Sequence, residues 1–193
     1  MNLPNKLSIL RMCMIPVFVV FFFLDGIVPY NYFISMIIFA LASFTDFLDG
    51  YIARKYNLVT NLGKFLDPIA DKVLVATALI LMCAVPVILP WYFAIAVAVI
   101  LARELMISGF RMQAASRGMV LAADKIGKAK TVFQDVAICV LLAGVDFFGV
   151  KCLSGLFGII NIVGLSLLGI AALLTIVSGA NYIIKNRQVL KDA

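Results

Sequence analysis

The chain has 193 residues, of which 64% are hydrophobic and only 13% charged, with a net charge of +6 and no histidine. This composition excludes an ordinary soluble globular protein, and it predicts that residues 1–193 form a single membrane domain. The lack of histidine removes the commonest general base and transition-metal ligand. The spacing of the four cysteines indicates neither a zinc site nor a disulfide framework.

Six apolar segments follow one another along the chain, and each is long enough to cross a hydrocarbon layer of about 30 Å as a helix. The connections between them contain proline, glycine or clustered charges. The first segment is not followed by a small-residue cleavage site, so it is interpreted as a membrane helix rather than a signal peptide. The predicted fold is therefore all-α, with transmembrane helices at Leu7–Val28, Tyr32–Arg54, Pro68–Val85, Trp91–Arg111, Ala129–Phe148 and Leu156–Ile184.

Positive residues predict the orientation of these helices, because short connections rich in Lys and Arg are retained in the cytoplasm. The predicted topology places fifteen of the sixteen Lys and Arg residues on one side of the membrane and only Lys151 on the other. Both termini are therefore predicted to be cytoplasmic. Together with attraction to anionic lipid headgroups, this topology accounts for the net positive charge without nucleic acid as a partner.

Four of the ten acidic residues lie where the second predicted helix ends and the third begins. Asp46 and Asp49 are three residues apart, and Asp67 and Asp71 are four apart, so each pair shares one face of a helix. In an antiparallel helix hairpin, both pairs would converge near the membrane surface. Four carboxylates at one point repel each other, so positive charge is expected between them.

Oxygen ligands without histidine or thiolate suit magnesium, manganese or calcium, and two such ions could stabilise both the attacking and the leaving oxygen of a phosphate displacement. Three of the four aspartates also have a simpler interpretation. Asp67 precedes a proline, as a helix N-cap does; Asp49 precedes a glycine, as in a turn; and Asp46 could line an ion path. A carboxylate-lined ion transporter is thus the alternative class, although no second copy of the acidic pattern follows Asp71.

The acidic segment resembles the signature of the CDP-alcohol phosphatidyltransferases, a family of membrane enzymes. Eight signature positions within 26 residues agree, namely Asp46, Asp49, Gly50, Ala53, Arg54, Gly63, Asp67 and Asp71. The resemblance implies six helices with cytoplasmic termini, in the cytoplasmic membrane, with the active site facing the cytoplasm. It also implies that an alcohol attacks the phosphate joined to the diacylglycerol of a CDP-linked lipid and expels CMP.

By this resemblance, the four aspartates would bind two divalent ions, Mg²⁺ or Mn²⁺, and Asp71 would also accept the proton of the attacking hydroxyl. Space for the nucleotide of the CDP-diacylglycerol donor would be left by Gly50, Ala53 and Gly63, with Arg54 nearby. These roles agree with the chemistry, because cations neutralise a diphosphate and a positioned carboxylate assists the nucleophile.

A second cluster of positive charge, at the end of the fourth predicted helix and the start of the fifth, bears on the acceptor alcohol. Arg103 and Arg111 are eight residues apart, near one face of the fourth helix, and Lys128 and Lys130 lie at the start of the fifth. Guanidinium and ammonium groups bind phosphate oxygens, so these four residues are expected to contact the phosphate of a phosphorylated acceptor. Glu104 adjoins Arg103 but is expected on a different face of the helix, so it is not expected to neutralise this arginine.

The segments ARELMISGFR, GKAKTVFQ and NLPNKLSILR resemble the bacterial branch of this family whose acceptor is glycerol 3-phosphate. The expected reaction therefore transfers a phosphatidyl group from CDP-diacylglycerol to glycerol 3-phosphate, giving phosphatidylglycerophosphate and CMP in phospholipid synthesis. Inositol phosphate is the alternative acceptor.

Several glycines lie just before or within the last predicted helix, among apolar residues, including Gly155, Gly158, Gly164 and Gly169. Small residues let two helices approach closely. This composition suits packing within one chain as well as packing between two, and the family resemblance favours a homodimer.

Overall fold

The computed structural model describes residues 3–55, 61–116, 125–147 and 154–185, and these residues form helices joined by turns. Side chains are described in residues 7–45, 69–114, 126–146 and 158–185. The helices are α1 (Leu3–Phe22), α2 (Asn31–Lys55), α3 (Asn61–Cys83), the short 3₁₀ helix η1 (Trp91–Phe93), α4 (Ala94–Ser116), α5 (Lys125–Phe147) and α6 (Ser154–Lys185). The all-helical class and the six long helices predicted from the apolar segments are confirmed within the described residues.

Two helix ends differ most from the prediction. Helix α1 ends at Phe22 rather than near Val28, because the chain turns at Gly26, whose φ of 77° is readily adopted only by glycine. Helix α3 begins at Asn61 rather than at Pro68, so the polar stretch interpreted as a long connection is partly helical. Asp67 consequently lies inside α3, and its interpretation as an N-cap is wrong.

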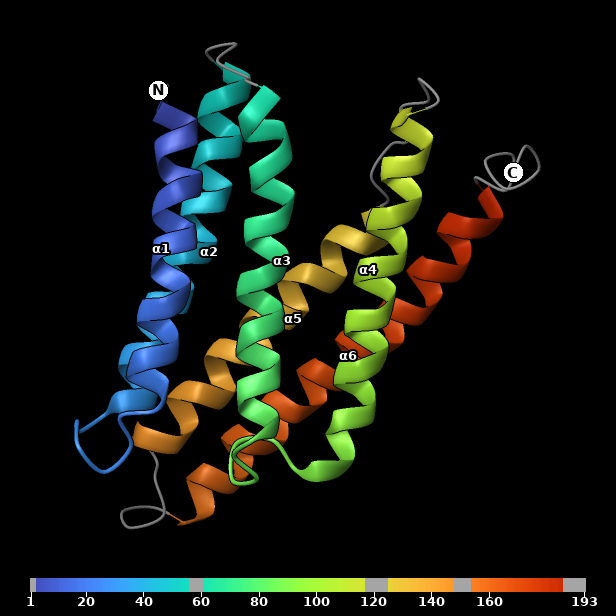
Figure 1. Cartoon of the computed structure of the whole chain (residues 1–193). Helices are drawn as coiled ribbons and strands as arrows, with labels where there is room; N and C mark the ends of the chain where they lie inside the picture. The colour runs from blue at the N-terminus through green and yellow to red at the C-terminus, as the bar shows by residue number, and fades with distance from the viewer. Residues whose placement is uncertain (1–2, 56–60, 117–124, 148–153, 186–193) are drawn as a thin grey trace.

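The six helices form two groups that meet along α5 (Figure 1). Helices α1, α2 and α3 pack together, α5 contacts α2 and packs along α6, and α4 packs against α6. Helix α3 contacts α4 through only a few residues. Several helix ends lie together at one end of the molecule in Figure 1. They are the start of α1, the end of α2, the start of α3, the end of α4, the start of α5 and the end of α6. The described helix ends that flank the predicted basic connections therefore lie at one end of the molecule.

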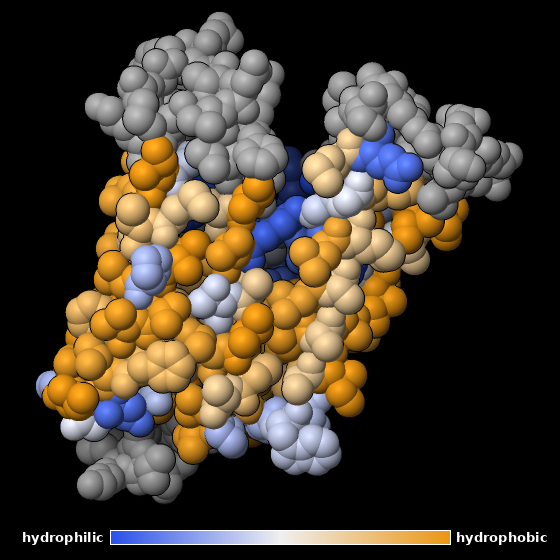
Figure 2. All heavy atoms as spheres, viewed as in Figure 1, coloured by the Kyte–Doolittle hydropathy of each residue, from blue (hydrophilic) through white to orange (hydrophobic). Residues whose placement is uncertain are grey.

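The outer surface is apolar, as a membrane protein requires. Large apolar side chains are exposed along several helices, including Val20, Ile95, Leu105 and Leu173, which are 58%, 70%, 71% and 66% exposed. Figure 2 shows this hydrophobic surface on both sides of a cleft that contains hydrophilic residues. Within the described residues, two helical stretches are long and apolar enough to cross a membrane by length and composition, Trp91–Ala114 and Gly158–Lys185.

Close packing joins α5 to α6 in the interior. A Cβ atom added to Gly164 of α6 would lie 2.6 Å from Cγ of Leu141, a buried residue of α5. Gly164 therefore permits a close approach of these two helices within the monomer. Among the described residues, nothing lies within 4 Å of a Cβ added to Gly158 or Gly169. Their role in a dimer stays a prediction.

The end of the molecule remote from the termini is fixed by polar contacts. Asp146 near the end of α5 accepts a hydrogen bond of 2.7 Å from the backbone N–H of Phe33 in the first turn of α2. The Asn31 side chain donates to the backbone carbonyl of Phe22, which ends α1. These bonds satisfy helix-end groups that would otherwise lack partners, and they hold α1, α2 and α5 together.

Candidate active site

The predicted acidic cluster lies on the hairpin of α2 and α3. Asp46 and Asp49 are in the last part of α2, whereas Asp67 and Asp71 are in the first half of α3. Asp71 is partly buried, and its side chain is described. The side chains of the other seven signature residues lie outside the described part of the structure, so their convergence on metal is not tested: these are Asp46, Asp49, Gly50, Ala53, Arg54, Gly63 and Asp67.

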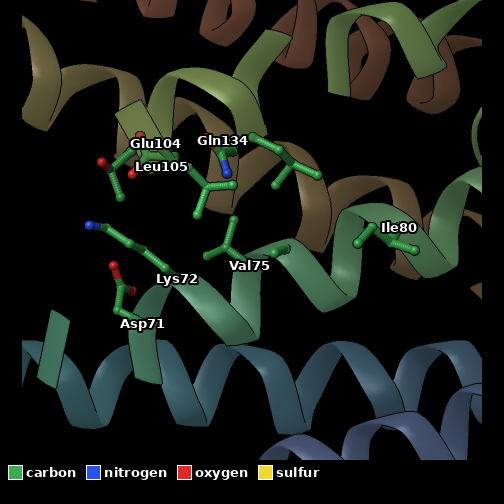
Figure 3. Close-up of a pocket in the computed structure, with 10 residues that line it drawn as sticks. Asp71, Lys72, Val75, Ile80, Glu104, Leu105 and Gln134 are labelled. Atoms are coloured by element: carbon green, nitrogen blue, oxygen red, sulfur yellow. The ribbon is translucent and has the colours of Figure 1, made fainter. Parts of the chain in front are cut away.

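A cavity of about 210 Å³ lies next to Asp71, between α3, α4 and α5 (Figure 3). Its polar lining comes from all three helices: Asp71 and Lys72 of α3, Glu104 of α4, and Thr131 and Gln134 of α5. The rest of the lining is apolar and includes Ile80 and Leu105, which are 55% and 71% exposed. The cavity therefore combines polar groups with an apolar side that continues onto the outer surface.

Glu104 holds two of the predicted acceptor-binding cations beside this cavity. Its carboxylate accepts a hydrogen bond from Lys130 of α5 and another, at 3.1 Å, from Arg103 Nη1 of its own helix. The Lys130 side chain is only 3% exposed and the Arg103 side chain 12%. The prediction that Glu104 does not neutralise Arg103 is therefore wrong: the side chains of adjacent residues on a helix start in different directions, but the arginine is long enough to reach the carboxylate.

Arg103 is also anchored to α6. Its Nη2 donates a hydrogen bond of 2.7 Å to Ser178 Oγ, and a Cβ added to Gly179 would lie 3.2 Å from Arg103 Cγ. A Cβ added to Gly127 of α5 would likewise lie 3.7 Å from Arg103 Nη2. Gly179 thus leaves room for the Arg103 side chain against α6, whereas a Cβ at Gly127 would make only an ordinary contact with it.

Arg111 faces α6 as well, two turns further along α4. Its Nε donates to the hydroxyl of Tyr182 at 3.1 Å, and its guanidinium carbon lies 5.3 Å from the centre of the same ring. This cation–π geometry orients the guanidinium while leaving the residue exposed. The prediction that Arg103 and Arg111 share a face of the helix is confirmed by their common contact with α6.

The two predicted acceptor-binding lysines of α5, Lys128 and Lys130, differ in their burial. Lys130 is buried against Glu104, whereas Lys128 is exposed two residues earlier, on another face of the helix. The structure thus brings Arg103 and Lys130 onto one carboxylate, and it places Arg111 on the same side of α4 as Arg103.

Several polar residues near the cavity were not singled out from the sequence. Lys72 donates a hydrogen bond to Ser108 Oγ, which in turn donates to the backbone carbonyl of Glu104. Gln134 lies four residues after Lys130, and this spacing, which places two residues on one helix face, could have identified it. Arg11 of α1, which does not line the cavity, is fully buried, although the charge pattern predicts for it only a part in orienting the helices.

The profile of the CDP-alcohol phosphatidyltransferase family matches residues 1–179. The chain therefore belongs to this family, as its acidic signature predicts, and it is an enzyme that transfers phosphatidyl groups.

Three relatives are similar to the chain over nearly its whole length. The chain is 39% identical to a protein of Bacillus subtilis over 203 residues, which cover 100% of this chain and 98% of the relative. It is 40% identical to a protein of Rickettsia typhi, covering 94% of each chain, and 36% identical to a protein of Shigella flexneri, covering 99% of this chain and 98% of the relative. All three relatives are named CDP-diacylglycerol–glycerol-3-phosphate 3-phosphatidyltransferase.

Proposed function

We propose that this enzyme transfers the phosphatidyl group of CDP-diacylglycerol to glycerol 3-phosphate, releasing CMP and forming phosphatidylglycerophosphate. The observation that carries the proposal is the pairing of Arg103 and Lys130 with Glu104 beside a cavity that Asp71 also lines. Cations bind the phosphate of the acceptor, and the nearby carboxylate serves its hydroxyl. The names of the relatives support the same acceptor.

In the proposed reaction, a primary hydroxyl of glycerol 3-phosphate attacks the phosphorus atom joined to diacylglycerol. A new oxygen–phosphorus bond forms, the bond from this phosphorus to the CMP oxygen breaks, and Asp71 takes the hydroxyl proton. Arg103, Arg111, Lys128 and Lys130 bind the acceptor phosphate and hold the hydroxyl towards Asp71. Holding both reactants in place removes much of the entropic cost of their encounter.

We assign two divalent ions, Mg²⁺ or Mn²⁺, to the carboxylates of Asp46, Asp49, Asp67 and Asp71. The donor set fits these hard cations, because it consists of oxygen atoms and because Asp71, the one described member, is partly buried at the cavity. When bound, the ions would neutralise the diphosphate of the donor.

The donor nucleotide is assigned to the surface of α2 and α3. Gly50, Ala53 and Gly63 leave it space, and Arg54 lies near its phosphates. The diacylglycerol part remains in the membrane, which suits a cavity whose apolar side continues onto the outer surface.

We place the protein in the cytoplasmic membrane with six membrane-spanning helices, both termini and the active site facing the cytoplasm. The asymmetric distribution of Lys and Arg supports this orientation. A homodimer is proposed from the family resemblance.

The test is CMP release by the purified protein in detergent with CDP-diacylglycerol and Mg²⁺. Glycerol 3-phosphate, inositol phosphate, serine and no acceptor are compared, and a chelator removes the metal. Release that needs both metal and glycerol 3-phosphate, and that falls at least about a thousandfold in Asp71→Asn, is the expected result. Asp146→Asn, the same change at the opposite end of the molecule, is the matched control. Release with inositol phosphate instead would overturn the proposed acceptor.

A further inference from the structure

The cavity contains a neutral polar group with no part in the proposed binding of phosphate or metal. Gln134 of α5 is 2% exposed, and its Oε1 atom has no hydrogen-bond partner among the described residues. Its side chain lines the cavity that Asp71, Lys72 and Glu104 line from the other two helices (Figure 3). A buried amide oxygen without a partner is unfavourable, and a ligand that supplies the missing hydrogen bond recovers this cost.

The position of Gln134 along α5 indicates what it would bind. It follows Lys130 by four residues, or one helical turn of about 6 Å, on the same face of the helix. A phosphate near Lys130 would therefore leave the carbon chain of a short phosphate ester beside the amide. An amide binds a hydroxyl in either orientation of its side chain, because it offers both a donor and an acceptor.

We propose that Gln134 is a specificity residue that binds the secondary hydroxyl of glycerol 3-phosphate. This inference depends on the proposed function, which supplies the acceptor. With the phosphate near Arg103 and Lys130 and the secondary hydroxyl on Gln134, the primary hydroxyl is the group left for Asp71. Gln134 thereby selects which hydroxyl reacts.

Other polar residues of the cavity lining already have hydrogen-bond partners, and this is why we assign the role to Gln134. Thr131 also lines the cavity, but its hydroxyl already donates to the backbone carbonyl of Gly127 at 3.1 Å. Lys72 is hydrogen-bonded to Ser108, and Glu104 is paired with Lys130 and Arg103. Among the described polar residues of the lining, Gln134 has the unsatisfied atom that a hydroxyl would fill.

The experiment compares glycerol 3-phosphate with 3-hydroxypropyl phosphate, which keeps the phosphate and the primary hydroxyl but lacks the secondary hydroxyl. For the wild type, kcat/KM is expected to be about tenfold higher with glycerol 3-phosphate, as one neutral hydrogen bond allows. In Gln134→Met, which has a similar length without hydrogen-bonding groups, the two values should agree within about twofold. Thr131→Val is the matched control, and the wild-type ratio is expected to remain in it.

Gln134→Asn serves as a second variant if the methionine variant does not fold, because it keeps a polar amide but withdraws it by one methylene group. It too is expected to lose most of the preference. A wild-type ratio in either folded variant would overturn the proposal, as would a change confined to the KM for CDP-diacylglycerol. If the wild type releases CMP with neither phosphate ester, the proposed function fails and this inference fails with it. If the wild type is active but the variants keep the wild-type ratio of the two kcat/KM values, the role of Gln134 is refuted and the proposed function stands.

Discussion

Lys130 of α5 and Glu104 of α4 form an ion pair beside the cavity, and the lysine is almost completely buried. The same carboxylate pairs with Arg103, which α6 holds through Ser178. One glutamate therefore links three helices and sets the positions of two cations before any substrate is present. A phosphate entering this site would meet cations already oriented, which reduces the ordering that binding requires.

Glu104→Gln tests this arrangement. The amide keeps the shape of the side chain but removes the negative charge, so that Lys130 and Arg103 lose an anionic partner in a poorly solvated site. Because Glu104 is still 23% exposed, we expect a loss of about 2 kcal/mol, below the range for fully buried pairs. The corresponding fall in Tm, measured in detergent, would be about 6 °C.

Glycerol 3-phosphate provides the second part of this test. Its phosphate would replace the missing anion, so it should raise the Tm of Glu104→Gln more than that of the wild type. Asp146→Asn, a change of carboxylate to amide at the other end of the molecule, should show the wild-type response. Equal shifts in all three proteins would contradict a phosphate site at these cations.

Tyr182 is expected to act on the acceptor through Arg111. Tyr182→Phe removes the hydroxyl that accepts from Arg111 Nε and keeps the ring, so the KM for glycerol 3-phosphate should rise about threefold. Tyr182→Leu also removes the cation–π contact and should raise this KM about tenfold, with kcat changed less than about twofold. Steady-state kinetics at saturating CDP-diacylglycerol measure both values.

The exposed Tyr92, which lies in η1 and far from Arg111 in the sequence, supplies the control Tyr92→Phe. A rise in the KM for the donor, with that for glycerol 3-phosphate unchanged, would show that Arg111 does not serve the acceptor.

The sequence predicts the architecture well for a physical reason. Long apolar runs in a lipid are expected to be helical, because a lipid offers no partners for backbone groups, and the six apolar runs of this chain correspond to the six long helices. The family follows from residues with fixed spacing, since Asp46 to Asp71 carry the signature at eight positions. Both inferences depend on patterns that are local in the sequence.

The parts of the site that the sequence did not predict depend on contacts between distant helices. The Glu104–Lys130 ion pair joins residues 26 positions apart in the sequence. The hydrogen bond from Arg103 to Ser178 joins residues 75 positions apart. Side-chain length also matters, because Arg103 reaches Glu104 although adjacent residues point in different directions on a helix. The predicted start of α3 is wrong because polar residues near a membrane surface can form a helix as readily as a loop.

Asp146 is expected to stabilise the end of the molecule remote from the cavity. Asp146→Ala leaves the N–H of Phe33 in the first turn of α2 without its acceptor, which should cost about 1 to 2 kcal/mol. Asp146→Asn retains an acceptor oxygen and should cost less. Thermal unfolding in detergent measures the losses, while CMP release per folded molecule should stay at the wild-type level. A large fall in that specific activity would mean that this end also serves catalysis.

Gly164→Ala is expected to separate α5 from α6. The added methyl group would lie 2.6 Å from Cγ and 2.7 Å from Cδ2 of Leu141, which is 1% exposed and has little room to move. Overpacking of this kind costs about 1 to 3 kcal/mol, and the better helix propensity of alanine offsets up to about 1 kcal/mol. We therefore expect a net destabilisation of about 1 kcal/mol, measured by thermal unfolding in detergent.

Gly169→Ala is the matched control for this change, because it lies on the same helix with nothing within 4 Å of the added methyl group. It gains the same helix propensity without the clash, so its stability should equal or slightly exceed that of the wild type. In a Leu141→Val background, where the shorter side chain leaves space, the cost of Gly164→Ala should shrink. Equal stability of the two alanine variants in the wild-type background would contradict the claim that Gly164 is needed for the close approach of α5 and α6.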